Sequence, residues 1–179
     1  ILSWNLSRLA ETLIPLVDSD QDRAISLLTE AINTIAPTYE RYWLVEMRSK
    51  IGLANVGLHD LELINDLLSI MEKQKVDFTL FFSGLSKALS DNSNSIRKLF
   101  IDPLTYDTWA SRWRERLLTE GTPEDDVVKA MNKVNPSYIP RNHKVEEALS
   151  AAVDNQDLKP FSRLLAIVTK PFDEASGNE

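Results

Sequence analysis

The segment from Asn135 to His143 holds the residues of this chain best suited to recognition or chemistry. It reads Asn-Pro-Ser-Tyr-Ile-Pro-Arg-Asn-His, and its two prolines prevent a regular helix. Arg141 offers a planar fork of donors that suits a carboxylate or the carbonyls at a helix end. We expect Asn142 to cap a following helix through its side-chain oxygen. The segment is either a contact to a partner domain or a nucleotide, or a buried structural corner, and the corner is favoured. The candidate structural or interdomain motif is therefore Asn135, Pro136, Arg141, Asn142 and His143.

A second cluster combines arginines with tryptophans. Arg112 and Arg116 share a helical face near Trp109 and Trp113. Such a face could hold a phosphate or stack on a base. The favoured interpretation places the tryptophans in the core with the arginines over their rims, because the chain carries a net charge of -7 and repels phosphate backbones.

No familiar catalytic motif is present. The sequence has no cysteine, no Gly-rich phosphate loop and no GxSxG elbow. His59 and His143 lie far apart, and neither belongs to an HExxH motif. A Ser–His–Asp triad needs no sequence proximity, so spacing alone does not decide against one. We predict no catalytic, cofactor-binding or metal-binding residue in this chain, and we interpret the neighbouring acids as solvated helix faces: Glu146 with Glu147, Asp125 with Asp126, and Glu62 with Asp66.

The elements that carry these residues follow a helical period throughout. The first helix has a leucine stripe and is expected to end near Pro15, and Gly52 and Gly121 are natural helix stops. Asp60 and Asp77 are expected to cap the helices that follow them. The stripe of the first helix comprises Leu2, Leu6, Leu9, Leu13 and Leu16.

This pattern predicts an all-α fold, an irregular multi-helix domain. Of its 179 residues, 43% are hydrophobic and 26% are charged, which is typical of a globular chain. We predict a single helical domain over residues 1–172 and a polar tail over 173–179, with a loop at 90–94. We expect no nucleic-acid or membrane partner, because the chain is acidic and lacks an apolar run of about 20 residues. The chain begins at Ile1 inside a predicted helix, so we expect that something upstream was removed.

A family resemblance rests on the order of several motifs. Asn135-Pro136, Ile139 and Arg141-Asn142-His143, followed by Val145-Glu146 and Ala148-Leu149, resemble the C-terminal motif of the SelO (YdiU) family. The start of the chain, with Trp4-Asn5-Leu6 and Leu13-Ile14-Pro15-Leu16, looks like the helix after that family's catalytic region. Asp77-Phe78-Thr79 and the two tryptophans of the cluster keep the family order between these ends.

The resemblance implies a larger kinase-like protein that transfers AMP from ATP to Ser, Thr or Tyr hydroxyls of proteins. It implies ATP and Mg (or Mn) as cofactors of the full-length protein, bound by residues upstream of this chain. The chain would then be the C-terminal helical region, with a structural or substrate-docking role. Its partners would be the upstream kinase-like catalytic region and protein substrates, and its compartment the cytoplasm if bacterial or the mitochondrion if eukaryotic. The alternative is an independent helical protein-interaction module without enzymatic activity.

Overall fold

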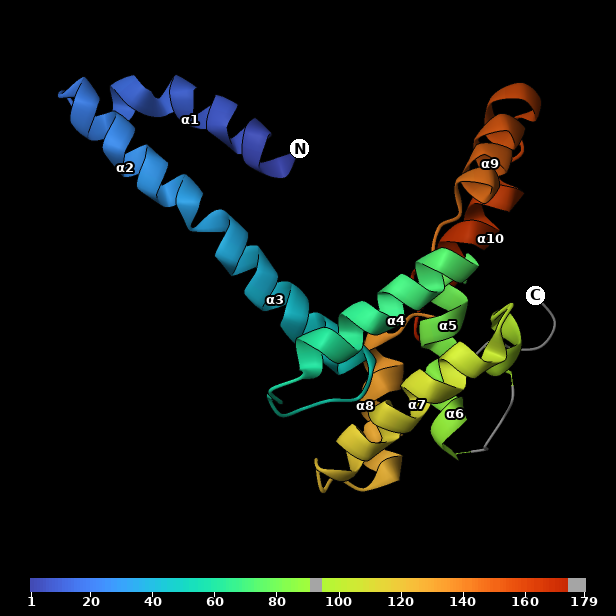
Figure 1. Cartoon of the computed structure of the whole chain (residues 1–179). Helices are drawn as coiled ribbons and strands as arrows, with labels where there is room; N and C mark the ends of the chain where they lie inside the picture. Colours follow the sequence, from blue (N-terminus) through green and yellow to red (C-terminus); the bar gives the residue numbers. More distant parts are fainter. Residues whose placement is uncertain (91–94, 174–179) are drawn as a thin grey trace. The chain divides into compact units, whose positions relative to one another are not determined.

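The chain folds as helices joined by short connections in this computed structural model, which describes residues 1–90 and 95–173 (Figure 1). No strand occurs among these residues, and the all-α prediction is confirmed. The helices are α1 (Leu2–Val17), α2 (Gln21–Asn33), α3 (Ile35–Lys50), α4 (Asp60–Gln74), α5 (Phe78–Leu85), α6 (Lys87–Ser90), the 3₁₀ helix η1 (Arg97–Leu99), α7 (Pro103–Leu118), α8 (Glu124–Val134), α9 (Asn142–Asn155) and α10 (Lys159–Val168).

The chain divides into two compact units, Ile1–Glu46 and Met47–Glu179, with the boundary inside α3. We call them the N-terminal unit and the C-terminal unit. The prediction of one domain over 1–172 stays a prediction, because compact units can belong to a single domain. Most of the predicted tail and of the predicted loop at 90–94 lies outside the described residues.

Aromatic side chains form the core of the C-terminal unit. Trp109 and Trp113 of α7 are buried and stacked, with ring centroids 5.4 Å apart and planes 13° apart. The indole N–H of Trp109 donates to the Leu63 carbonyl at 2.9 Å, and that of Trp113 donates to the Ile51 carbonyl at 2.8 Å. The predicted core position of both tryptophans is confirmed. Neither indole leaves a buried donor unsatisfied, so each ring adds apolar burial without a polar penalty.

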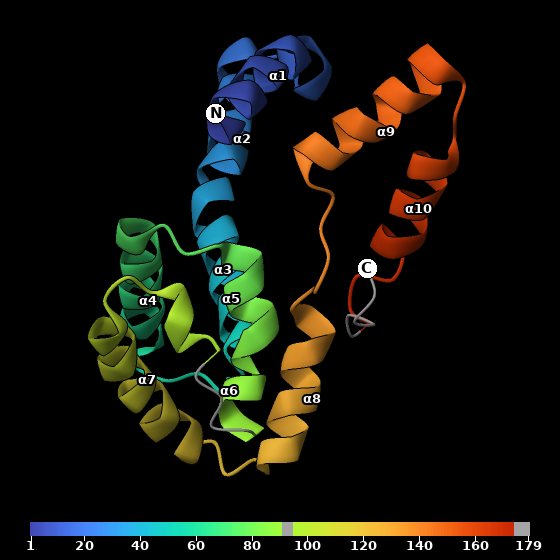
Figure 2. The same ribbon diagram turned by 90° about the vertical axis from the view of Figure 1, so that its right-hand side faces the viewer.

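Helix α5 contacts Trp109 through Phe81, whereas α9 and α10 pack on each other. Helix α4 packs on α7, and α6 packs on α8 (Figure 2). Phe81 of α5 lies edge-on to Phe82, Phe100, Tyr106 and Trp109. Edge-to-face aromatic pairs add stabilisation beyond their buried area. Aliphatic side chains complete the core, among them Ile51, Leu63, Ile64, Leu67, Met71, Leu85, Ile96 and Met131.

The N-terminal unit packs much less tightly. Helices α1 and α2 form an antiparallel hairpin, and Asp20 caps α2 by accepting from the N–H groups of Asp22 and Arg23 (Figure 1). Only small side chains of the hairpin, Ala10 and Ala24, are buried. Helix α1 continues through Pro15 to Val17, beyond its predicted end. At this late position the proline deprives only the Glu11 carbonyl of its helical donor.

Three leucines of the α1 stripe are exposed, whereas Leu6 and Leu13 are half-buried. Leu2, Leu9 and Leu16 repeat every seven residues and are 57%, 53% and 79% exposed. The helix turns Ala10 and Ile14 toward α2, where they line a shallow hollow. The periodicity correctly predicted a helix, but three of the five leucines it marks are not covered by the described residues.

Three of the predicted helix ends are confirmed. Gly52 and Gly121 follow α3 and α7 with φ of 79° and 66°, a backbone conformation that favours glycine. Asp77 caps α5 by accepting from the Leu80 N–H at 2.9 Å. The predicted cap at Asp60 is wrong, because His59 occupies the cap position and Asp60 is the first residue of α4.

Candidate functional site

Asn135, the first residue of the candidate motif, is a buried clamp. Its side-chain N–H donates to the Lys50 carbonyl at 2.8 Å, and its side-chain oxygen accepts from the Lys50 ammonium at 3.4 Å. The same ammonium donates to the Val134 carbonyl at 3.1 Å. Asn135 therefore ties the end of α8 to the end of α3, and its amide groups are engaged by the protein itself.

The residues after Pro136 are fixed to the far end of the chain. Pro136 stops α8 and is half-buried. The N–H groups of Ser137 and Tyr138 both donate to the Pro171 carbonyl, at 2.7 and 3.3 Å. Because Pro171 follows α10, these two bonds close the α9–α10 hairpin at its base.

Arg141 links this hairpin to the aromatic core. One of its terminal nitrogens lies 2.8 Å from a carboxylate oxygen of Asp77, the residue that caps α5. The hydrogen bond from Arg141 is the main cause that holds the pKa of Asp77 below its ordinary value, and Asp77 in turn raises the pKa of Arg141. The predicted carboxylate partner of Arg141 thus lies within the chain.

The predictions for the rest of the motif differ. Arg141, not Asn142, occupies the N-cap position of α9, with φ of -81° and ψ of 131° and no side-chain capping bond. Its carbonyl accepts from the N–H groups of Lys144 and Val145, so the helix has already begun at Asn142. The predicted cap at Asn142 is therefore wrong. His143 is exposed in the first turn of α9. The motif splits into a structural part, Asn135 to Arg141, and two solvent-facing residues.

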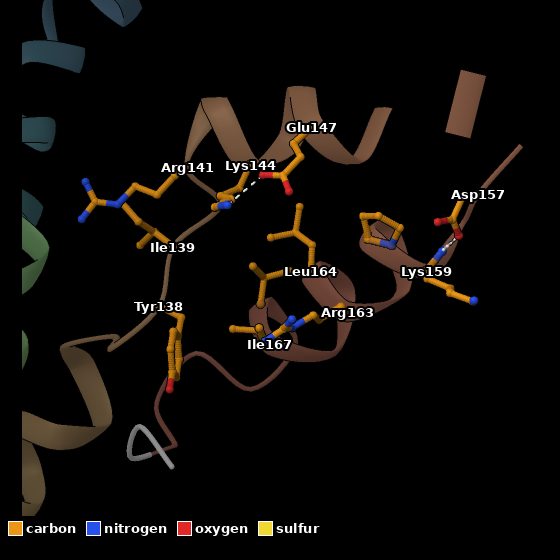
Figure 3. A pocket seen from close by; sticks show the side chains of 12 residues that line it. Tyr138, Ile139, Arg141, Lys144, Glu147, Asp157, Lys159, Arg163, Leu164 and Ile167 are labelled. Atoms are coloured by element: carbon orange, nitrogen blue, oxygen red, sulfur yellow. Dashed lines mark hydrogen bonds and ion pairs between the residues drawn. The ribbon is translucent and has the colours of Figure 1, made fainter. Parts of the chain in front are cut away.

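A cavity of about 580 Å³ opens between α9, α10 and the segment before α9 (Figure 3). Leu164 points from α10 toward the ion pair of Lys144 with Glu147 on α9, whose atoms are 2.7 Å apart. The size falls within the range of small-molecule and peptide pockets. Its lining is Tyr138, Ile139, Arg141, Lys144, Glu147, Asp157, Lys159, Pro160, Arg163, Leu164, Ile167 and Val168.

The C-terminal unit contains a buried ion cluster that the sequence did not predict. The side chain of Asp60 is 1% exposed, and its two oxygens accept from Arg48 and Arg116, each at 2.8 Å. The Gly57 N–H donates to the same carboxylate at 2.7 Å. Burial alone raises the pKa of Asp60, but the hydrogen bonds from Arg116, Gly57 and Arg48 outweigh it and lower that pKa.

This cluster holds the loop between α3 and α4. Arg116 also contacts Glu120 at 2.6 Å and donates to the Asn55 carbonyl at 2.8 Å. Glu120 accepts from the N–H groups of Ala54 and Asn55 and from the Asn55 side chain, at 3.2, 3.0 and 2.9 Å. Burial alone raises the pKa of Glu120, and these bonds together with Arg116 lower it. The loop is consequently fixed by charged hydrogen bonds.

The arginine face at the tryptophans is thus explained within the chain. Arg112 pairs with Asp66 at 2.6 Å and lies 3.7 Å from Glu62, in an exposed setting. Arg116 is committed to Asp60 and Glu120. Both arginines bind carboxylates of the chain rather than only covering the rings. The acids Glu62 and Asp66, predicted to be solvated, are exposed as expected.

Within residues 1–90 and 95–173, no three or more His, Asp or Glu side chains are grouped so that they could hold a metal ion. No helix in the same ranges has the length and apolarity that crossing a membrane requires.

Comparison with known proteins identifies the family. The model of the family described as "Protein adenylyltransferase SelO" matches residues 1–169. A "Protein nucleotidyltransferase YdiU" of Rhizobium rhizogenes is 43% identical over 173 residues, which are 96% of this chain and 34% of the relative. Proteins with the same name from Rhodopseudomonas palustris and Cereibacter sphaeroides are 42% and 43% identical, over 97% and 100% of this chain and 36% of each relative. The chain therefore spans about a third of the length of these curated relatives. With the match covering nearly all of its residues, the chain belongs to the SelO family.

Proposed function

We propose that this chain is the C-terminal helical region of a protein adenylyltransferase, which transfers AMP from ATP to Ser, Thr or Tyr hydroxyls of other proteins. The chain has a structural or substrate-docking role, and the catalytic groups belong to the rest of the polypeptide. Its bacterial relatives favour a cytoplasmic location. Membership of the SelO family and the short span of the chain on its relatives support this assignment.

The observation that carries the proposal is the uncovered leucine stripe of α1. Leu2, Leu9 and Leu16 follow one face of a helix whose own buried residue is an alanine. Contiguous apolar surface of this kind marks an interface in proteins. We assign its partner as the upstream kinase-like region of the same polypeptide.

ATP and Mg (or Mn) are assigned to that other region. A metal–triphosphate site needs carboxylate oxygens free to coordinate the cation and donors free to hold phosphate. The Asp60 cluster does not fit that requirement: Asp60 uses both oxygens on arginines, and Arg48 and Arg116 are neutralised by it. These charged groups instead hold the loop between α3 and α4.

Adenylyl transfer is the direct test. The full-length protein, the 179-residue chain and a full-length Leu9→Asp variant are incubated with ATP labelled at the α-phosphate and with protein acceptors. We expect label transfer by the full-length protein, none by the chain alone, and reduced transfer by the variant, whose interface is charged. Val153→Asp places the same charge at another exposed apolar residue, on α9, and as the control it retains transfer. Transfer by the isolated chain would overturn the proposal.

The alternative is a helical interaction module with no enzyme attached. The reading frame upstream of Ile1 separates the two: a kinase-like segment there supports the adenylyltransferase, and its absence supports the module.

A further inference from the structure

The cavity of the α9–α10 hairpin has a fixed frame. Arg141 anchors its first wall to Asp77, and the paired bonds from Ser137 and Tyr138 to the Pro171 carbonyl anchor its base. At the other end, Gln156 turns the chain from α9 to α10 with a left-handed φ of 55°. A frame held at both ends loses little conformational freedom when a ligand enters.

The lining of this cavity is amphipathic. Ile139, Leu164, Ile167 and Val168 provide the apolar floor, and Tyr138 closes one side (Figure 3). Basic side chains surround this floor. Arg141 and Lys144 are neutralised by Asp77 and Glu147, respectively.

Two further cations have no such neutralisation. Neither the Lys159 ammonium nor the Arg163 guanidinium forms an ion pair with any residue in the described part of the chain, and both line the cavity. The Asp157 carboxylate, which accepts from the Lys159 backbone N–H at 2.9 Å, also lines the cavity, so the unpaired groups carry two positive charges and one negative charge. The positive charge at the cavity contrasts with the net charge of -7 of the whole chain.

We propose that this cavity binds an acidic segment of a partner protein, in which a large apolar side chain lies beside Asp or Glu. The apolar side chain occupies the floor formed by Leu164 and Ile167, and the carboxylates pair with Arg163 and Lys159. Arg163 suits this role because its fork can bind a carboxylate through two hydrogen bonds. The proposal concerns recognition by the chain itself and does not depend on adenylyl transfer.

Peptide selection tests this site. The intact protein is presented with a phage library of random heptapeptides, and the affinity of the best peptide is then measured by fluorescence anisotropy. We expect the selected peptides to combine Asp or Glu with a large apolar residue. A Lys159→Glu/Arg163→Glu variant should lower the affinity by roughly tenfold or more, because two attractive charges become repulsive.

The control variant also replaces two lysines or arginines by glutamates, but at positions outside the cavity. Lys73→Glu/Lys98→Glu alters two exposed lysines outside the cavity and should keep the affinity within about twofold. Circular dichroism establishes that both variants are folded. Failure to select any peptide, a neutral or basic consensus, or equal affinity for the cavity variant and the unmodified protein would each overturn the proposal.

Discussion

The two units of this chain use the same kind of helix with different outcomes. In the C-terminal unit, apolar positions of α4, α5 and α7 meet around stacked tryptophans. In the N-terminal unit, α1 and α2 bury only alanines, and Leu2, Leu9 and Leu16 of the stripe are exposed. An amphipathic period predicts a helix and an apolar face but not what covers that face. The C-terminal unit supplies its own cover, whereas we assign the cover of the N-terminal unit to the rest of the protein.

The largest contrast is expected between tryptophans of the two units. Trp113→Ala removes a fully buried ring that stacks on Trp109, so the free energy of unfolding should fall by about 3–5 kcal/mol. Trp4→Ala removes an exposed ring and should change that energy in the 179-residue chain by less than about 0.5 kcal/mol. Urea unfolding followed by circular dichroism measures both. Similar losses for the two variants would contradict the contrast.

Charged residues sharpen the comparison within the C-terminal unit. Asp60→Ala leaves Arg48 and Arg116 without their buried carboxylate and should cost about 3 kcal/mol of unfolding free energy. Asp66→Ala breaks only the exposed pair with Arg112 and should cost about 0.5 kcal/mol. The same urea experiment compares them, and a small effect at Asp60 would show that the loop between α3 and α4 is held by other contacts.

The pH dependence of stability should belong mainly to the C-terminal unit. Asp60 and Glu120 have lowered pKa values in the folded chain, so on acidification the unfolded chain binds protons first, near the ordinary values of 3.8 and 4.5. Their contribution is complete at neutral pH and is lost as the pH falls below about 5 toward the folded pKa values. Urea midpoints measured from pH 7 to pH 3 should therefore decline less steeply in Asp60→Ala. Parallel declines in the two proteins would argue against this role of Asp60.

A substitution in the exposed leucines of α1 should change the unfolding free energy little in the isolated chain but more in the full-length protein. Leu9→Ser changes an exposed side chain of α1 and should alter the unfolding energy of the 179-residue chain by less than about 0.5 kcal/mol. In the full-length protein, where we propose that the stripe is covered, the loss should be about 2 kcal/mol. Val153→Ser on α9 serves as the exposed control in both backgrounds. Equal effects of Leu9→Ser in the two proteins would leave the stripe without a partner.

Helix ends set by neighbouring residues could be predicted from the sequence, whereas hydrogen-bond partners far apart in the sequence could not. Gly52 and Gly121 end helices through their own backbone conformation, and Asp77 caps a helix through a hydrogen bond to a residue three positions away. The sequence therefore predicted all three correctly. Asp60 looked like a cap in the same way, but its partners lie 12 residues upstream and 56 residues downstream. A carboxylate before an apolar helical stripe fits a cap and a buried ion cluster equally well.

The candidate motif shows the same limit. Its prolines correctly indicated an interruption before α9, and the donors of Arg141 suggested a carboxylate. That the carboxylate is Asp77, and that Asn135 binds the end of α3, depends on how the chain folds back on itself. The exposure of the α1 leucines likewise could not be predicted, because an exposed apolar stripe and a buried one have the same sequence period.

Hydrogen exchange of backbone amides tests the central claim most directly, by comparing the 179-residue chain with the full-length protein. Amides of α1 and α2 should exchange at least about 100-fold more slowly in the full-length protein, because covering their apolar face suppresses local opening. Amides of α4 and α7, which the aromatic core already protects, should change little. Equal exchange of α1 and α2 in the two proteins would contradict the claim that the rest of the polypeptide covers the N-terminal unit.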